Sequence, residues 1–193
     1  EEINYASLPN QFVLKPNHGS GWVVICEDKI NTNTQKINEK LKSWLNLNFY
    51  YLSGEWQYRN IEKKIICEEL IQGMKDIVDY KFFCFNGVPK IIEVDLDRHT
   101  NHTQSFYDLD WNKLDISRFY PSNNNQLDKP KGLKDMIDIA KSLSEEFTFC
   151  RVDLYNANGK IYFGEITLHP ASGHGPFETY EQDLRIGKML DIT

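Results

Sequence analysis

The sequence predicts an α+β fold built of two lobes. Short segments rich in Val, Ile, Phe and Tyr, which are typical of strands, dominate the first two thirds of the chain. Apolar residues with helical spacing occur in separate stretches, and the two kinds of signal do not alternate strictly. A doubly wound parallel sheet needs that alternation, so we expect two α+β lobes instead.

Five short strands are expected, at residues 12–15, 22–26, 64–68, 80–85 and 90–94. The pair Asn86-Gly87 separates the last two and is typical of a tight turn, because both residue types tolerate positive φ. We therefore expect these two strands to form a hairpin.

Helical spacing predicts a first helix at residues 37–45 and a second at 133–147. An aspartate and a proline just before the second helix favour its start there. A third helix, with a weaker apolar stripe, is expected at about residues 180–190. The polar segment 122–132, SNNNQLDKPKG, is a linker or an exposed loop where a lobe boundary can fall.

Composition limits the function classes. The 193 residues, 40% of them apolar, are enough for one large domain or two small lobes. The 22 basic and 28 acidic residues give a net charge of −6, which argues against nucleic acid as a partner. The chain has neither an apolar run of about 18 residues nor the start of a signal peptide. We expect a cytoplasmic protein without an integral membrane segment, and the oligomeric state stays open.

The four cysteines, Cys26, Cys67, Cys84 and Cys150, lie far apart in apolar or strand-like runs. Their spacing fits neither a disulfide framework nor a metal site. We expect buried free thiols in a reducing compartment.

The segment FVLKPNHGSG, residues 12–21, runs from a strand through Lys15 into a polar loop with two glycines. Proline, asparagine and glycine let a strand stop and reverse, so an ordinary turn is one interpretation. The other is a phosphate cradle, in which glycines let backbone N–H groups approach an anion and Lys15 adds a positive charge. The segment alone leaves both open.

A second hairpin is expected near the C-terminus, with strands at 150–155 and 161–167. Arg151 and Asp153 share a face of the first strand, and Glu165 and Thr167 share a face of the second. An odd connection, such as the five residues 156–160, places Arg151 opposite Glu165 and all four residues on one face. An even connection without a bulge separates them.

Two interpretations of this hairpin remain open. In one, its acids simply face solvent. In the other, they form a magnesium site, because Mg²⁺ takes one or two carboxylates and completes its shell with water and phosphate oxygens. An arginine beside it would neutralise a phosphoryl group during transfer.

Four segments together carry a family resemblance: Lys15 with NHGSG, then IICEELI, DYKFFCFNGVPKIIEVDLDR, and RVDLY with GEITLHPASG. Their order is similar to that of ATP-grasp proteins, and the chain resembles the TupA-like ATP-grasp family over nearly its whole length. That family is associated with teichuronopeptide and capsular polysaccharide synthesis. The resemblance implies one ATP-grasp domain, residues 1–193, whose α+β lobes, approximately 1–67 and 68–193, hold ATP between them.

The resemblance also implies roles for individual residues. Lys15 would contact the ATP phosphates, and the glycine loop would close over them through Asn17, His18, Gly19, Ser20 and Gly21. The adenine and ribose would lie against Glu68, Glu69, Leu70 and Ile71, with Asp79 a further ribose candidate. Near the transferred phosphate would lie the basic residues Lys81, Arg98 and Arg151.

The implied Mg²⁺ ligands are Asp153, Glu165 and Thr167, and Thr167 stands where the family generally has asparagine. The family also usually has a region ahead of Lys15 with another nucleotide-contacting lysine and part of the acceptor site. The chain does not begin with Met, and its first strand signal comes almost at once. We expect it to be the later part of a longer protein.

The implied activity is that of an ATP-dependent carboxylate–amine ligase that forms an amide through an acyl phosphate. Its acceptors would be an amino acid or a uronic-acid glycan of the cell surface, handled in the cytoplasm or at the periphery of the membrane synthesis machinery. Two alternatives stay open: a sugar-directed phosphotransferase with the same ATP site, and a non-catalytic nucleotide-binding module.

Overall fold

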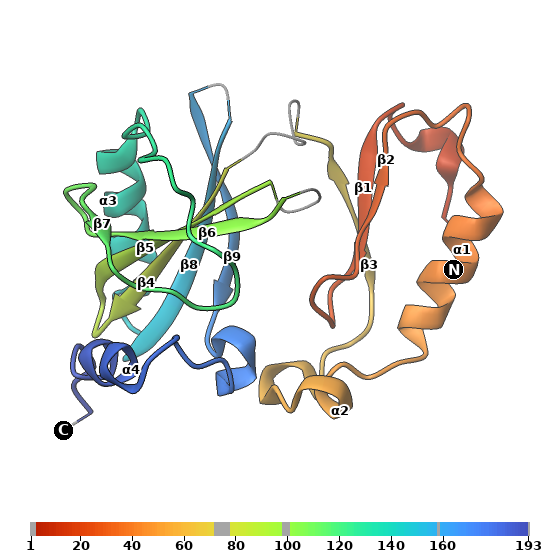
Figure 1. The fold of residues 1–193 in the computed structure, drawn as a ribbon. Coiled ribbons are helices and arrows are strands. Elements are labelled where there is room, and N and C mark those ends of the chain that lie inside the picture. The colour runs from red at the N-terminus through yellow and green to blue at the C-terminus, as the bar shows by residue number, and fades with distance from the viewer. Residues whose placement is uncertain (1–2, 72–77, 98–100, 158, 193) are drawn as a thin grey trace. The chain divides into compact units, whose positions relative to one another are not determined.

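The computed structural model describes residues 3–71, 78–97, 101–157 and 159–192 (Figure 1). The chain forms two compact units, Glu1–Gln72 and Gly73–Thr193. Each unit has its own antiparallel sheet. The segment 68–71, which the sequence analysis assigned to the second lobe, belongs to the first unit.

The first unit is built on a three-stranded sheet in the order β2-β1-β3. Its strands are β1 (Phe12–Pro16), β2 (Val24–Cys26) and β3 (Ile65–Glu69). Helix α1 (Thr34–Leu45) packs Ile37 and Leu41 against Phe12 and Leu14 of β1. The helix begins before the expected residue 37 because the Asn33 side chain caps it by accepting from the Lys36 N–H. The short elements are η1 (Tyr5–Ser7), α2 (Tyr50–Ser53) and η2 (Trp56–Tyr58).

The second unit is built on a six-stranded sheet in the order β7-β6-β5-β4-β8-β9. The strands are β4 (Asp79–Phe85), β5 (Val88–Leu96), β6 (Thr103–Tyr107), β7 (Lys113–Leu114), β8 (Phe149–Ala157) and β9 (Lys160–Thr167). The expected hairpin at Asn86-Gly87 joins β4 to β5 and is confirmed. Strands β6 and β7 were not predicted from the sequence.

The two faces of this sheet differ in chemistry. One face is apolar and is covered by α3 (Leu133–Ser144), whose Met136 and Ala140 pack in the same core as Phe82 and Val152. The other face is apolar only at one end, where α4 (Tyr180–Gly187) contributes Ile186. The rest of that face is polar and carries the candidate site. Both helices end earlier than expected. A further short helix is η4 (Pro170–Gly173).

Two β-bulges set which side chains reach the polar face. On β5, Cys84 pairs with Pro89 but Phe83 pairs with Ile91, which leaves Lys90 as the extra residue. A proline is tolerated in a strand at such a position. The bulge therefore changes the face on which the rest of β5 presents its side chains.

The second bulge lies on β9. Leu154 pairs with Phe163 but Asp153 pairs with Glu165, so Gly164 is the extra residue. Strand β8 ends at Ala157 and β9 begins at Lys160, so the connection has two residues. The odd connection of five residues, 156–160, is therefore wrong. Arg151 consequently lies opposite Thr167 rather than Glu165. The bulge compensates for the even connection and keeps the four polar residues on one face.

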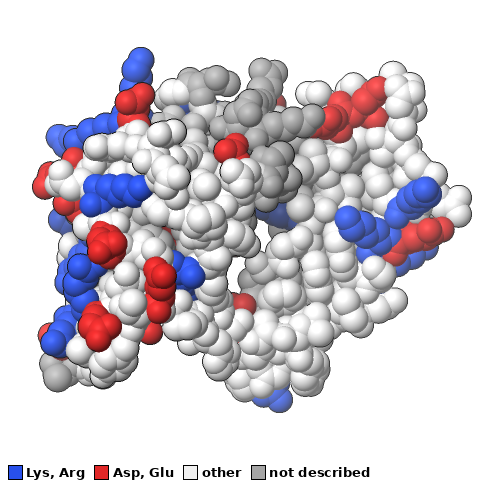
Figure 2. All heavy atoms as spheres, in the orientation of Figure 1, with Lys and Arg blue, Asp and Glu red and all other residues white. Residues whose placement is uncertain are grey.

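The remaining expectations concern the surface charge, membrane-spanning helices and the four cysteines. On the face shown in Figure 2, acidic and basic side chains are interspersed over the second unit without a continuous basic patch. No helix in the described part of the chain is long and apolar enough to cross a membrane. All four cysteines are free; Cys26, Cys84 and Cys150 are buried as expected, but Cys67 on β3 is exposed, contrary to expectation.

We expect Gly164→Ala to destabilise the second unit by about 1–3 kcal/mol. A Cβ there would lie 2.9 Å from the carbonyl oxygen of Asp153 and 3.1 Å from Cε2 of Tyr155. Urea unfolding measures the change, with Gly187→Ala as control because a Cβ at Gly187 meets nothing within 4 Å. Equal unfolding midpoints for the wild type and Gly164→Ala would contradict the close approach at this bulge.

Candidate functional site

A row of charged residues crosses the polar face of the six-stranded sheet. Glu165, Asp153, Lys81 and Glu93 lie in direct register on β9, β8, β4 and β5. Directly paired residues point to the same side of a sheet, so the four side chains are neighbours. Asp153, Lys81 and Glu93 are buried, whereas about half of the Glu165 side chain is exposed.

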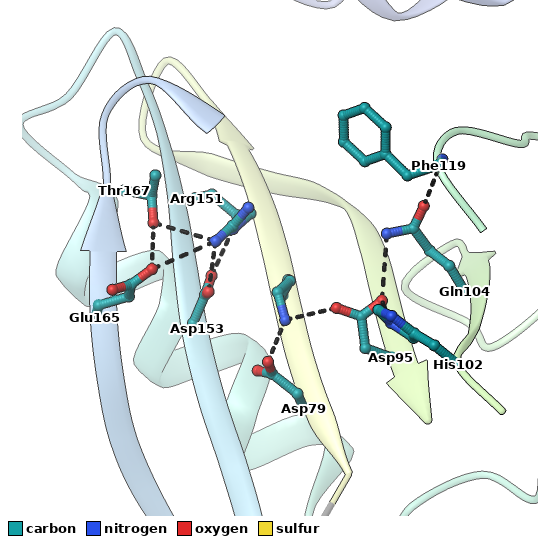
Figure 3. Close-up of polar contacts among 10 residues, drawn as sticks. Asp79, Asp95, His102, Gln104, Phe119, Arg151, Asp153, Glu165 and Thr167 are labelled. Atoms are coloured by element: carbon teal, nitrogen blue, oxygen red, sulfur yellow. Dashed lines mark hydrogen bonds and ion pairs between the residues drawn. The ribbon is translucent and has the colours of Figure 1, made fainter. Parts of the chain in front are cut away.

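Arg151 joins the residues of β8 and β9 into one cluster (Figure 3). Its Nε and Nη2 donate to the two carboxylate oxygens of Asp153, both at 2.7 Å. Nη2 also lies 3.2 Å from Thr167 Oγ1 and 3.5 Å from Glu165 Oε1. The Thr167 hydroxyl donates to Glu165 Oε1 at 2.9 Å. The structure thus brings together all four residues that the hairpin pattern singled out.

Lys81 is the centre of a second, buried cluster. Its Nζ contacts Asp79 Oδ2 and lies 2.8 Å from Asp95 Oδ2. Burial lowers the pKa of Lys81, but Asp79, Asp153 and Asp95 outweigh this effect and the net pKa is raised. Lys81 therefore stays charged. Asp79, a ribose candidate in the sequence analysis, is buried and contacts this lysine.

Three further polar residues extend the Lys81 cluster across β5 and β6. Gln104 Nε2 donates to Asp95 Oδ1 at 3.2 Å, and His102 Nε2 lies 3.1 Å from the same oxygen (Figure 3). Glu93 is 2% exposed, and its Oε2 has no hydrogen-bond partner among the described residues. Burial, with a smaller effect of Asp95, raises the pKa of Glu93 to about 7. None of these three residues, nor Asp95, was among the site residues predicted from the sequence.

The oxygens at β8 and β9 fit a hard divalent cation. Asp153 and Glu165 are directly paired, and the Thr167 hydroxyl lies beside them. Within the described ranges, no three His, Cys, Asp or Glu side chains are placed to hold a metal by themselves. Two carboxylates suffice for Mg²⁺ when phosphate oxygens and water complete its shell. The donor set therefore suits Mg²⁺ bound together with a nucleotide.

In the first unit, Lys15 and the loop after it are held by neighbouring residues. Lys15 Nζ forms an ion pair with Glu68 Oε1 at 2.7 Å, and both side chains are partly exposed. Asn17 Nδ2 donates to the Glu62 carbonyl at 2.9 Å, and Asn17 Oδ1 accepts from the Lys64 N–H at 2.8 Å. The Asn17 amide thus fastens the loop to the segment that leads into β3.

His18 and Gly19 fix the next part of this loop. His18 is 1% exposed, its Nε2 lies 3.1 Å from the Trp44 carbonyl oxygen, and its ring meets Trp22 edge-on. Gly19 packs so closely on Trp22 that a Cβ would lie 2.5 Å from the indole. Ser20 and Gly21 are exposed. Only the tip of the glycine loop is therefore free to meet a ligand.

The other predicted residues lie at the end of β3 or outside the described residues. Glu68 and Glu69 are exposed on β3, and Leu70 and Ile71 are half-buried just after it. Arg98 lies outside the residues that the structure describes. The predicted residues thus form one group in the first unit and another in the second.

We expect Glu93→Gln to raise stability more at high pH than at low pH. The pKa of Glu93 lies at about 7 in the folded protein against the ordinary 4.5, so ionising it costs stability as pH rises through this window. Glutamine cannot ionise, so the free energy of unfolding of Glu93→Gln should exceed that of the wild type by an amount that grows with pH. This difference should rise from near zero below the window to at most about 3 kcal/mol above it. Urea unfolding from pH 4 to 8 in Mg²⁺-free buffer measures this difference.

The exposed Glu146 supplies the control for that titration, because Glu146→Gln should show no such growth with pH. A difference between Glu93→Gln and the wild type that is independent of pH would contradict the raised pKa.

Comparison with solved structures shows the fold. D-alanine–D-alanine ligase from Bacillus anthracis matches 98% of this chain and 54% of its own, with 19% identity and a TM-score of 0.50. The same enzyme complexed with ATP matches 86% of this chain and 43% of its own, with 17% identity and a TM-score of 0.44. The ligase from Helicobacter pylori matches 86% of this chain and 44% of its own, with 17% identity and a TM-score of 0.45. The fold resembles that of the Bacillus anthracis ligase. The chain spans about half the length of these ligases.

Sequence comparison defines the family. No curated protein sequence matches the chain. The sequence model of the family described as TupA-like ATPgrasp matches residues 1–191. The chain therefore belongs to the TupA-like ATP-grasp family.

Proposed function

We propose that this chain acts as an ATP-dependent carboxylate–amine ligase that forms an amide through an acyl phosphate in cell-surface polysaccharide biosynthesis, of teichuronopeptide or capsule. The observation that carries the proposal is the cluster of Arg151, Asp153, Glu165 and Thr167 beside the buried Lys81, in a member of the ATP-grasp family. This arrangement combines metal-binding oxygens with cations that can stabilise a phosphoryl group.

In this proposal Asp153 and Glu165 hold Mg²⁺, and Thr167 contributes its hydroxyl directly or through water. When bound, Mg²⁺ neutralises charge on the phosphate oxygens of ATP. Arg151 already spans the two carboxylates, so a cation there would free part of its guanidinium to face the phosphoryl group. The side chain is then a charge stabiliser placed where negative charge develops.

Lys81 supplies a second fixed positive charge, and Arg98 is retained as a third candidate. The carboxylates of Asp79 and Asp95 keep Lys81 charged and limit its rotamers. Fixed charges need no reorganisation during reaction, which is the physical basis of electrostatic catalysis. We therefore assign Asp79 and Asp95 as positioning residues for Lys81.

The first unit is proposed to bind the rest of the nucleotide. Lys15 would contact the phosphates, and the backbone N–H groups around Ser20 and Gly21 would approach them. Asn17, His18 and Gly19 would hold the loop in place, because their side-chain or packing contacts are to Glu62, Trp44 and Trp22. The adenine and ribose would lie against Glu68, Glu69, Leu70 and Ile71.

We expect Glu165→Gln to weaken Mg²⁺-dependent binding of a non-hydrolysable ATP analogue at least about tenfold, or about 1.4 kcal/mol. The substitution removes a negative charge from the proposed metal site but keeps the side-chain shape. Calorimetric titration with and without Mg²⁺ measures the loss. Glu146→Gln is the matched control, and unchanged Mg²⁺-dependent binding by Glu165→Gln would refute the metal assignment.

We expect Lys15→Ala to weaken binding of the same analogue at least about tenfold, because it removes the charge proposed to meet the phosphates. Lys64→Ala is the control, since Lys64 is an exposed lysine of the same unit that pairs with Glu62. If the two variants bound the analogue equally well, the loop after β1 would be an ordinary turn.

A further inference from the structure

A pocket of about 180 Å³ lies in the second unit beside η4 and α4. Its walls are mainly apolar and include Phe83, Phe149, Phe177 and Ile186. Arg118 is the one charged residue among the described residues that line it. A mostly apolar pocket with a single placed charge is typical of small-molecule sites.

Arg118 is fixed in a definite orientation. Its Nε and Nη2 donate to the Gly175 carbonyl oxygen at 3.2 and 2.7 Å. Its guanidinium stacks on the rings of Phe119 and Phe177, at 4.6 and 5.1 Å from their centroids. No described carboxylate forms an ion pair with it, so the outer edge of the guanidinium, Nη1 and the second N–H of Nη2, keeps free donors.

Gly175 makes this orientation possible. A Cβ at this position would lie 2.9 Å from Arg118 Nη2 and 2.3 Å from Phe119 Cζ. Only glycine therefore lets the guanidinium and the ring lie against the chain here. This close fit indicates a built site rather than a surface arginine.

The pocket lies beside the candidate phosphoryl-transfer site. Phe83 pairs directly with Arg151, and Pro170, which also lines the pocket, follows Thr167 by three residues. Arg118 is also close enough to Arg151 and Glu93 for their charges to affect its pKa. A molecule in the pocket would thus adjoin the groups assigned to phosphoryl transfer.

We propose that this pocket binds an amino acid as the amine substrate of the ligase, with its carboxylate on Arg118 and its aliphatic part against the phenylalanine rings. The inference rests on the proposed function and names one of its two reactants. A guanidinium edge matches the two oxygens of a carboxylate, and the aromatic walls suit carbon chains. A uronic acid also has a carboxylate, but its ring hydroxyls would be buried against apolar walls without partners, at a cost in free energy.

The reaction that this substrate would complete is balanced. The amine nitrogen attacks the acyl carbon, the C–N bond forms, and the C–O bond to phosphate breaks. Of the two protons that the ammonium group loses, one goes to the departing phosphate and one to solvent. Arg118 takes no part in these steps and acts as a specificity-determining residue.

The test compares ligands that differ only in the group that Arg118 would bind. Glycine, L-alanine, L-glutamate and L-lysine, each beside its α-carboxamide, and glucuronate are titrated into the chain with the ATP analogue and Mg²⁺ present, by ligand-observed NMR. We expect at least one amino acid to bind and its amide to bind at least about tenfold more weakly. Equal binding of acid and amide, binding of glucuronate alone, or binding of none would overturn the proposal.

Variants locate the effect in the pocket. Arg118→Gln should abolish the preference for acid over amide, whereas Arg185→Gln, a change to an exposed arginine of α4, should retain it. Neither variant should alter binding of the ATP analogue, because neither residue belongs to the assigned nucleotide site. Loss of the preference in both variants would overturn the assignment to Arg118. Failure of the wild type to bind the ATP analogue would instead count against the proposed function. The comparison of acid and amide uses the wild-type chain, so it tests the proposal even if a variant does not fold.

Discussion

The polar face of the six-stranded sheet depends on the bulges at Lys90 and Gly164, because each inserts one residue into a strand whose side chains alternate. Without the first bulge, Lys81 would face Ile92, and Glu93 would point toward α3. Without the second, Asp153 would face Gly164, and Glu165 would lie opposite the buried Val152. The charged row exists because both shifts occur, and Gly164 can lie at its bulge because it has no Cβ to meet the Asp153 carbonyl.

The charge balance of this face is difficult to explain by stability alone. Among the described residues, Asp79, Asp95, Asp153 and Glu93 are buried with Lys81. Arg151 adds a second cation through its ion pair with Asp153, and Arg118 is close enough to Glu93 to affect the pKa of that carboxyl. Buried ion pairs rarely stabilise a fold more than apolar residues of the same volume, because both charges lose their hydration. Glu93 is a clear cost in free energy, because it is buried and its Oε2 has no hydrogen-bond partner among the described residues. A bound cation would neutralise an excess of buried acidic side chains, as in the proposed magnesium site.

The parts of the structure that were predictable from sequence are those fixed by local patterns. The Asn86-Gly87 turn and the apolar spacing of α3 act within a few residues, so their signals are visible in the chain. Glu93 and Asp95 stand in a visible alternation in IIEVDLD, but their approach to Lys81 depends on the bulge at Lys90, which the pattern does not specify. The resemblance implied that His18 closes over the phosphates with the glycine loop, and the sequence did not indicate that tertiary packing buries this residue against Trp22. The roles of individual site residues stay predictions.

Along one face of β4, the side chains change from charged to apolar within two residues. Lys81 belongs to the ionic row, and Phe83, two residues later on the same face, belongs to the apolar cluster that includes Ile186 of α4. Arg151 pairs with Phe83, while its guanidinium reaches back to Asp153 in the ionic row, so this residue bridges the two regions. A ligase of the proposed type needs such a junction. Phosphoryl transfer requires fixed charges, whereas an acyl phosphate must meet an amine before it meets water. The apolar pocket with Arg118 lies at the place where both requirements can be satisfied on one sheet.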